Sequence, residues 1–315
     1  MSVSMEVNLG SIILKNPVLT ASGTFGYGDD VPELVDVNRL GGIVTKSLSR
    51  KPRAGNPPVR VVETASGMLN SIGLANIGVD RFIAEKLPKL RLFSTAVIAN
   101  IAASSIDEYC DVLSLLEREE GIAGYEINVS CPNVKEGGLS FGTSPMLTAE
   151  ITKRLRALTK KTLILKLTPN VTQISEFARA VEAEGADGVS VINTVIGMAV
   201  DIRKRTPKLA TVTGGLSGPA IKPIALAKVY EVSRAVKIPV IGIGGIMTAE
   251  DAIEFMMVGA AAVQVGTANF VNPAAGVTIA EGIRRFCEEQ NISRVTELTG
   301  SLKVEHNLSV LSGWT

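Results

Sequence analysis

Polar side chains stand at the carboxyl ends of several apolar segments, where they could contact a bound ligand. They are Ser22, Lys46, Asn100, Asn128, Lys166, Asn193 and Thr194. Each one alone has an ordinary explanation, because strand ends meet solvent and asparagine suits turns. Lysine only donates hydrogen bonds, whereas asparagine both donates and accepts them. A set of amides and lysines with almost no carboxylates therefore favours an anionic or amide-bearing ligand.

One of the three cysteines stands out from the others. Cys131 is flanked by asparagines and is followed by Pro132 and a glycine-rich segment. A free cysteine is usually a small buried hydrophobe, and Cys110 and Cys287 fit that explanation because both lie in helical patterns. Cys131 fits it poorly, because a polar loop begins there. A thiol with an ordinary pKa of about 8.5 can accept a proton near neutral pH where its site favours the thiolate.

Glycine-rich segments follow the last two apolar segments, at Ile243-Gly244-Gly245-Ile246 and at Val265-Gly266-Thr267-Ala268. Glycine lets backbone N–H groups approach phosphate oxygens closely, and two such loops form the frequent phosphate site of a barrel enzyme. Gly214-Gly215-Leu216-Ser217-Gly218 offers a third backbone contact. The alternative is that these glycines only make tight turns, but the positions of both loops favour a phosphate.

The segment from Gly67 to Leu74 shows neither strand alternation nor a helical period. Its backbone N–H groups and the Asn70 amide suit a carboxylate or an imide. An ordinary surface loop explains the segment equally well.

Eight short apolar segments must position these side chains. They are residues 16–22, 42–48, 95–101, 124–131, 162–168, 188–194, 239–245 and 262–267. Nearly continuous apolar character is typical of strands buried on both faces of a parallel sheet. With helices between them, eight such strands predict a (β/α)8 barrel with short strand insertions at its carboxyl face. A doubly wound open sheet is the alternative, which the lack of a Gly-x-Gly-x-x-Gly after the first strand disfavours.

Amphipathic segments are expected as helices over 105–120, 148–159, 173–184, 222–236 and 248–258, with Thr148, Thr248 and Ser104 or Ser105 as N-caps. The long link Val195–Pro219 is expected to be functional or to carry its own small strands. The segment Pro132–Pro145 is interpreted as a mobile lid. No linker interrupts the pattern, so residues 1–315 are expected to form a single barrel domain.

Composition excludes several classes of function. The 315 residues carry 32 basic and 31 acidic side chains, a net charge of +1, which gives no electrostatic case for nucleic acid or a membrane surface. Three cysteines form neither a disulfide framework nor a metal pair, and a cytoplasmic setting fits. No signal peptide or spanning helix is expected. Because His306 is the single histidine, neither a histidine base nor a histidine-ligated metal is expected.

Five motifs together carry a family resemblance: Thr45-Lys46-Ser47, Gly55-Asn56-Pro57-Pro58, Asn70-Ser71-Ile72-Gly73-Leu74, Asn128-Val129-Ser130-Cys131-Pro132-Asn133 and Ile243-Gly244-Gly245. In this order they resemble the class 1 dihydroorotate dehydrogenases, and most closely the B type, the NAD-linked catalytic subunit. The resemblance runs from about residue 4 to residue 302.

The resemblance implies an FMN-binding barrel that oxidises (S)-dihydroorotate to orotate in de novo pyrimidine (UMP) biosynthesis. Cys131 would take the proton from C5 of the substrate while a hydride passes from C6 to flavin N5, and Lys46 would also be catalytic. For FMN the resemblance implies Ser22, Lys46, Ser47, Asn100, Asn128, Lys166, Ile192, Gly218, Gly244, Gly245, Gly266 and Thr267. For the substrate it implies Lys46, Asn70, Ser71, Ile72, Gly73, Leu74, Asn128, Asn193 and Thr194.

The B type also implies a second subunit that carries FAD and a [2Fe-2S] cluster and passes electrons to NAD+. Three scattered cysteines are too few to ligate such a cluster in this chain. The family precedent is a cytoplasmic heterotetramer around a dimer of this chain.

Two parts of the sequence depart from the family pattern. Ala75-Asn76-Ile77-Gly78 stands where Gln-Asn-Pro-Gly is usual, which is expected to loosen that loop. The tail from residue 303 extends beyond the resemblance, and a disordered end is expected there.

Three alternatives remain at this point. A fumarate-linked A-type dihydroorotate dehydrogenase shares the motifs. A dihydropyrimidine dehydrogenase would act on a neutral pyrimidine. A non-catalytic barrel that binds a phosphate ligand would be colourless, or would hold FMN that no substrate reduces.

Overall fold

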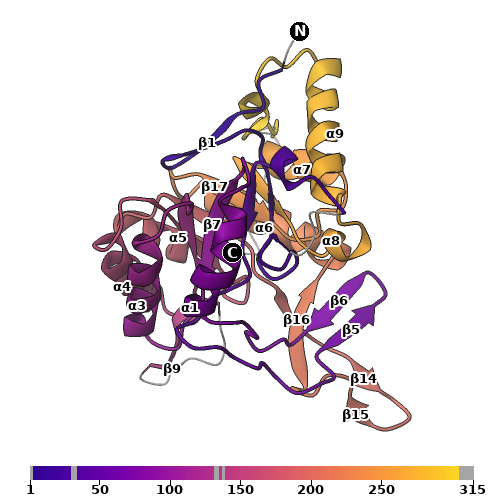
Figure 1. Cartoon of the computed structure of the whole chain (residues 1–315). Helices are drawn as coiled ribbons and strands as arrows, with labels where there is room; N and C mark the ends of the chain where they lie inside the picture. The colour runs from indigo at the N-terminus through magenta and orange to yellow at the C-terminus, as the bar shows by residue number, and fades with distance from the viewer. Residues whose placement is uncertain (1–2, 30–33, 131–134, 137–138, 305–315) are drawn as a thin grey trace.

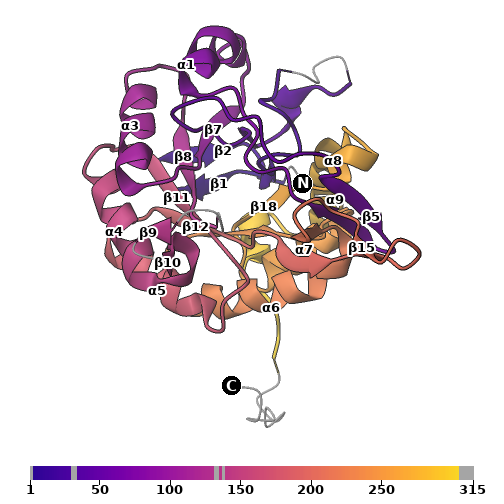
Figure 2. The same ribbon diagram turned by 90° about the horizontal axis from the view of Figure 1, so that it is seen from below.

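Eight parallel strands of the described chain close into a barrel with helices packed around it (Figures 1 and 2). The computed structural model describes residues 3–29, 34–130, 135–136 and 139–304. Each strand pairs with two neighbours, and β18 pairs with β3 to complete the ring. The predicted (β/α)8 barrel is confirmed, and the open doubly wound sheet is wrong.

The barrel strands coincide with the eight apolar segments. They are β3 (Val18–Thr20), β4 (Gly42–Val44), β7 (Ala96–Ile101), β8 (Gly124–Asn128), β11 (Thr162–Leu167), β12 (Gly188–Val191), β17 (Val240–Ile243) and β18 (Ala262–Val265). Nearly all of their residues are buried, because one face of each strand fills the barrel and the other packs against helices. The predicted polar residues lie after the strands or near their carboxyl ends, and Asn100, Asn128 and Lys166 belong to the strands themselves.

The helices surround the barrel in chain order, as the end-on view of Figure 2 shows. They are α1 (Val79–Arg81), α2 (Leu87–Leu90), α3 (Ile106–Glu117), α4 (Pro145–Arg156), α5 (Ile174–Ala183), α6 (Lys222–Ser233), α7 (Ala249–Met257), α8 (Ala268–Val271) and α9 (Ala275–Glu289); a π-helical turn, Phe82–Lys86, joins α1 to α2. No helix in the described part of the chain is long and apolar enough to cross a membrane.

The predicted start of α4 at Thr148 is wrong. The helix begins at Pro145, and the N-cap is Ser144, whose Oγ accepts a hydrogen bond from Leu147 N. Proline suits the first helical position because its fixed φ is already helical and it has no N–H to leave unpaired. Thr148 is buried one turn later and donates to Ser144 O.

The predicted cap of α7 is confirmed. Thr248 accepts from Asp251 N, and Asp251 accepts from Thr248 N, which together form a capping box. Burial alone would raise the pKa of Asp251. The hydrogen bonds from Lys222, Met247 N and Thr248 N outweigh burial and lower that pKa.

A second sheet stands on the carboxyl face of the barrel (Figure 1). It consists of the antiparallel strands β5 (Val61–Thr64), β6 (Gly67–Asn70), β16 (Thr213–Ser217) and β13 (Val195–Met198), and β14 (Val200–Asp201) with β15 (Thr206–Pro207) forms a hairpin beyond it. The expectation that Val195–Pro219 carries small strands is confirmed. The sheet therefore covers one side of the site at the strand ends.

The opposite end of the barrel is covered by the hairpin of β1 (Val7–Leu9) and β2 (Ile12–Leu14), which lies near the N-terminus in Figure 1. Ser11 in its turn donates from its backbone N to Thr162 Oγ1, at the start of β11. The hairpin therefore packs against the amino end of β11, at the end of the barrel opposite the second sheet.

Two expectations concern residues outside the described ranges. Of the expected lid, residues 135–136 and 139–140 form the paired strands β9 and β10, while residues 132–134 and 137–138 are not described. The tail from residue 305 onward also lies outside the described residues.

Candidate active site

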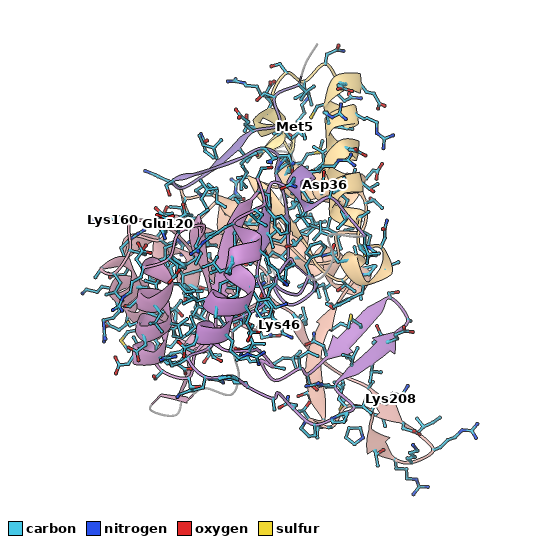
Figure 3. All side chains as sticks on the ribbon, viewed as in Figure 1. Met5, Asp36, Lys46, Glu120, Lys160 and Lys208 are labelled. Carbon is cyan, nitrogen blue, oxygen red and sulfur yellow. The ribbon has the colours of Figure 1, made fainter. Side chains whose placement is uncertain are left out.

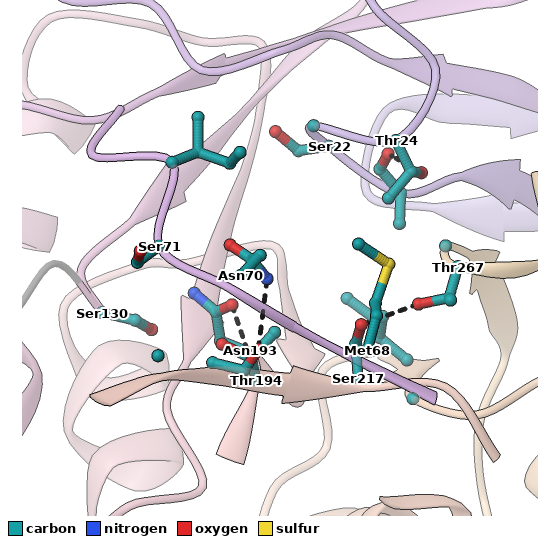
Figure 4. A pocket seen from close by; sticks show the side chains of 18 of the residues that line it. Ser22, Thr24, Met68, Asn70, Ser71, Ser130, Asn193, Thr194, Ser217 and Thr267 are labelled. Carbon is teal, nitrogen blue, oxygen red and sulfur yellow. Dashed lines mark hydrogen bonds between the residues drawn. The ribbon is translucent and has the colours of Figure 1, made fainter. Parts of the chain in front are cut away.

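A pocket of about 890 Å³ lies at the carboxyl ends of the barrel strands, between the barrel and the second sheet (Figure 4). Its volume is within the usual range for small-molecule and cofactor sites. The predicted site residues that line it are Ser22, Lys46, Ser47, Asn70, Ser71, Ile72, Gly73, Leu74, Asn128, Lys166, Ile192, Asn193, Thr194, Gly218, Gly244, Gly245, Gly266 and Thr267. Segments that lie far apart in the sequence thus meet in one place.

The charged side chains that line the pocket in the described part of the chain are all positive. Lys46 and Lys166 are the charged side chains among its described lining, and none of the described lining residues is acidic. Lys46 follows β4 and is half-buried, and its ammonium makes no hydrogen bond or ion pair with the described residues. Figure 3 places its side chain between the barrel and the second sheet. An unpaired, partly desolvated ammonium suits an anionic ligand.

Amides from neighbouring strand ends form a connected group. Asn193 Nδ2 donates to Asn128 Oδ1 (3.2 Å), which also accepts from Ser130 N. Thr194 N donates to Asn193 Oδ1 (2.8 Å), and this fixes which face of the Asn193 amide carries the donor. Tyr109 on α3 donates to Asn128 O and so ties the end of β8 to a helix. These bonds hold amide donors and acceptors along one wall of the pocket.

The segment expected as an irregular loop, Gly67–Leu74, is half strand. Gly67–Asn70 is β6, and Asn70 Nδ2 donates to Gly215 O across the second sheet (3.3 Å). Ser71 Oγ is buried beside the pocket without a hydrogen-bond partner among the described residues. A buried hydroxyl without a partner is costly unless a ligand or water bonds to it. The segment is therefore built as a wall with polar groups directed toward a ligand.

The segment Ala75–Gly78, which departs from the family pattern, is held to this wall by hydrogen bonds. Asn76 is buried, donates to Leu74 O (2.7 Å) and accepts from Gly78 N (2.8 Å). It also exchanges hydrogen bonds with Ser49. The asparagine amide thus makes these hydrogen bonds without the neighbouring glutamine and proline, and the expected loosening of the loop stays a prediction.

The glycines of the pocket fall into two groups. Gly245 has φ +74°, and a Cβ there would lie 2.8 Å from Lys222 N and 2.9 Å from Gly218 O. The protein's own turn requires glycine at that position. Gly266 has no positive φ, and a Cβ there would meet only Ala21 and Thr24, at 3.5 and 3.9 Å. Since the protein does not require glycine at position 266, a ligand lying against its backbone explains it better.

One predicted residue does not line the pocket. Asn100 is completely buried behind it, where its Oδ1 accepts from Ser47 Oγ (2.6 Å) and its Nδ2 donates to Glu126 Oε1 (2.6 Å). The side chain of Asn100 lies in the barrel interior and not in the pocket lining, so its expected contact with FMN stays a prediction that the pocket lining does not support. Glu126 was not predicted as a site residue; its position as a lone acid within the apolar strand 124–128 was the available signal.

Two of the three cysteines, Cys110 and Cys287, belong to the described residues, and Cys131 lies outside them. Cys110 in α3 is half-buried and Cys287 in α9 is buried, as predicted for structural thiols. Burial raises the pKa of both thiols, which makes them less available as bases at neutral pH.

Comparison with known proteins gives a consistent family. The family model "Dihydroorotate dehydrogenase" matches residues 4–287. A relative from Trichlorobacter lovleyi, named dihydroorotate dehydrogenase B (NAD(+)), catalytic subunit, is 56% identical over 303 residues, 96% of this chain and 100% of its own length. Relatives of the same name from Thermoanaerobacter sp. and Alkaliphilus metalliredigens are 54% and 53% identical and cover 96% and 95% of the chain, and 100% and 99% of their own lengths.

A solved structure supports the fold. The crystal structure of DHODH from Eimeria tenella in complex with ferulenol superposes with a TM-score of 0.79, at 20% identity, over 95% of this chain and 88% of that one.

Proposed function

The chain belongs to the dihydroorotate dehydrogenase family, among the B-type (NAD+) catalytic subunits, and on that premise we propose that it oxidises (S)-dihydroorotate to orotate in de novo pyrimidine (UMP) biosynthesis. The observation that carries the proposal is the pocket at the carboxyl ends of the barrel strands, which is lined by lysine and amide groups. The B-type names of the relatives favour NAD+ over fumarate as the final acceptor.

The charge of the pocket favours dihydroorotate over a neutral dihydropyrimidine. Dihydroorotate carries a carboxylate, and the Lys46 ammonium, which has no ion pair among the described residues, offers it a charge-assisted hydrogen bond. The imide edge of the ring presents alternating donors and acceptors, which the amides of Asn70, Asn128 and Asn193 match. In our proposal Lys46, Asn70–Leu74, Asn128, Asn193 and Thr194 bind the substrate.

The same pocket fits FMN. Its volume is about 890 Å³, its described charged residues are both cationic, and Gly266 leaves room against the backbone where the protein itself needs none. FMN would be held by Ser22, Lys46, Ser47, Asn128, Lys166, Ile192, Gly218, Gly244, Gly245, Gly266 and Thr267. When bound, the flavin supplies a hydride acceptor at N5 for the hydrogen on substrate C6.

The chain's own groups prepare this transfer. Lys46 and Lys166 stabilise negative charge that develops on the bound molecules, in a pocket where the field of a cation is weakly screened. The amide wall fixes the substrate ring and so supplies orientation. Cys131, at the end of the segment that follows β8, accepts the C5 proton in this proposal.

The partner and the setting follow the same premise. We propose an iron–sulfur and FAD subunit that passes electrons to NAD+, with a dimer of this chain at the core of a cytoplasmic heterotetramer. The described residues supply no cysteine pair for such a cluster, since Cys110 and Cys287 lie in separate helices.

The visible spectrum of the purified chain tests the function. We expect a yellow protein whose flavin band bleaches when dihydroorotate is added without oxygen, and does not bleach with dihydrouracil. Bleaching by dihydrouracil alone would favour a dihydropyrimidine dehydrogenase. A colourless chain that does not take up FMN would favour the non-catalytic barrel.

The Gly266→Ala variant tests whether FMN binds against the backbone of residue 266. The added methyl group meets no protein atom closer than 3.5 Å, so the free energy of unfolding of the flavin-free chain should change by less than about 0.5 kcal/mol. If a ligand lies against this backbone, FMN affinity should fall by about tenfold or more in a fluorescence titration. Lys208→Ala, at an exposed position outside the pocket lining, is the control. Unchanged FMN affinity in Gly266→Ala would place the cofactor elsewhere.

A further inference from the structure

A carboxylate that is not part of the pocket lining described above lies in the middle of the barrel. Glu126, on β8, is completely buried. Its Oε1 accepts from Asn100 Nδ2 (2.6 Å) and Lys166 Nζ (3.5 Å). Its Oε2 accepts from Gln264 Nε2 (2.6 Å) and Ser190 Oγ (2.8 Å). The donors come from four other barrel strands, so the carboxylate is the centre of a polar cluster that crosses the interior.

The donor set fits a carboxylate acceptor. Amide nitrogens and an ammonium only donate hydrogen bonds, so three of the four partners require an acceptor. The two carboxylate oxygens of Glu126 accept from all four partners. A buried anion is unfavourable without such partners, and Lys166 is the one cation paired with it among the described residues. Glu126 and Lys166 therefore act as a charge pair inside the barrel.

The cluster reaches the pocket at two points. Lys166 has a side chain only 7% exposed and lines the pocket while it contacts Glu126. Asn100 accepts from Ser47 Oγ, and Ser47 lines the pocket beside Lys46. Glu126 itself lies behind both. Its geometry can thus influence a ligand through the residues in front of it, and its charge adds to the field of Lys166 in the weakly screened interior.

We propose that Glu126 is a positioning residue that holds Lys166 against the flavin and sets how much of the lysine charge the flavin experiences. The inference rests on the proposed function. The carboxylate orients the ammonium and cancels part of its field in a weakly screened interior. An uncompensated Lys166 stabilises the reduced, more negative flavin further, so the pair keeps the flavin less oxidising than the lysine alone would make it.

The test is the two-electron reduction potential of the bound FMN, measured against a reference dye. Glu126→Gln keeps the shape and removes the charge. We expect the equilibrium constant for flavin reduction to rise by about tenfold or more, which corresponds to a positive shift of about 30 mV. Glu126→Asp keeps the charge but disturbs packing more, and its potential should stay within about threefold of the wild type.

If Glu126 had only a structural role, the two variants would be ranked in the opposite order by the size of their effects. It predicts that Glu126→Asp perturbs the protein at least as much as Glu126→Gln, with no shift of potential specific to loss of charge. An unchanged potential in Glu126→Gln, or an equal shift in both variants, would overturn the inference.

A second comparison tests whether the rise depends on the lysine. The double variant Glu126→Gln/Lys166→Met removes both charges, so the rise of about tenfold expected in Glu126→Gln should be absent from it. The double variant leaves no unpaired charge in the barrel, so it also serves if Glu126→Gln fails to fold, and its equilibrium constant should lie at or below that of the wild type. A double variant whose equilibrium constant exceeds that of the wild type by about tenfold contradicts action through the lysine.

The two proposals fail in different ways. A wild-type chain that binds FMN and is bleached by dihydroorotate, with an unchanged potential in Glu126→Gln, refutes only the role of Glu126. A wild-type chain that does not bind FMN refutes the proposed function, and the inference with it.

Discussion

Replacement of Cys131 by alanine is expected to leave FMN bound and to lower kcat with dihydroorotate by about 10²–10⁴-fold at neutral pH. This is the usual contribution of a general base. The alanine removes the proton acceptor and leaves the lysine and amide wall intact. Stopped-flow measurement of flavin reduction in single turnover checks the step directly, because it is independent of the electron-transfer partner.

Cys110→Ala is the matched control for this variant. Cys110 is half-buried in α3, and burial raises the pKa of its thiol, so its removal should leave the rate of flavin reduction unchanged. Equal rates in Cys131→Ala and in the wild type would remove Cys131 from the proposed mechanism. Comparable losses in both cysteine variants would indicate an effect on folding instead.

The Lys46→Ala variant should weaken dihydroorotate binding and slow flavin reduction together. A charge-assisted hydrogen bond contributes about 1.5–3 kcal/mol, so the dissociation constant is expected to rise by roughly 10- to 100-fold. Lys46 lies between the barrel and the second sheet with no ion pair to another described residue, so the loss reflects the ligand rather than a broken internal pair. Substrate titration of the oxidised enzyme and single-turnover reduction measure the two effects.

Lys208→Ala is the control for the lysine. Lys208 is exposed near the β14–β15 hairpin, away from the pocket lining, and Figure 3 shows it on this outer part of the molecule. Its replacement should leave both quantities unchanged. Normal binding and normal reduction in Lys46→Ala would contradict the dual role of Lys46. Weak binding with normal reduction would restrict Lys46 to the substrate carboxylate.

Much of the fold could be predicted because its signals are local. Each barrel strand is a short apolar segment, and each predicted segment contains one strand, from β3 (Val18–Thr20) to β18 (Ala262–Val265). The polar residue after a strand was also predictable as a pocket residue. Lys46, Asn128 and Thr194 line the pocket because parallel strands end at a common face.

Other features depend on residues outside the segment that carries the pattern. Gly67–Asn70 has no strand period in its own sequence, and it is a strand because it pairs with the neighbouring β5 and with β16, about 145 positions later. The start of α4 at Pro145 rather than Thr148 was decided by Ser144, one residue before the proline. Thr148 has the right residue type for an N-cap, but it is buried within the first turn of α4.

The sequence by itself determined the eight-stranded alternation, the residues at the strand ends and the family, because periodicity and motifs are properties of neighbouring residues. Only the tertiary structure decided which polar residues face a ligand and which support them from behind. Asn100 and Lys166 both belong to apolar strands, yet Asn100 is sealed in the interior and Lys166 reaches the pocket. That difference arises from the closure of the barrel, which brings Glu126 into contact with side chains from four other strands.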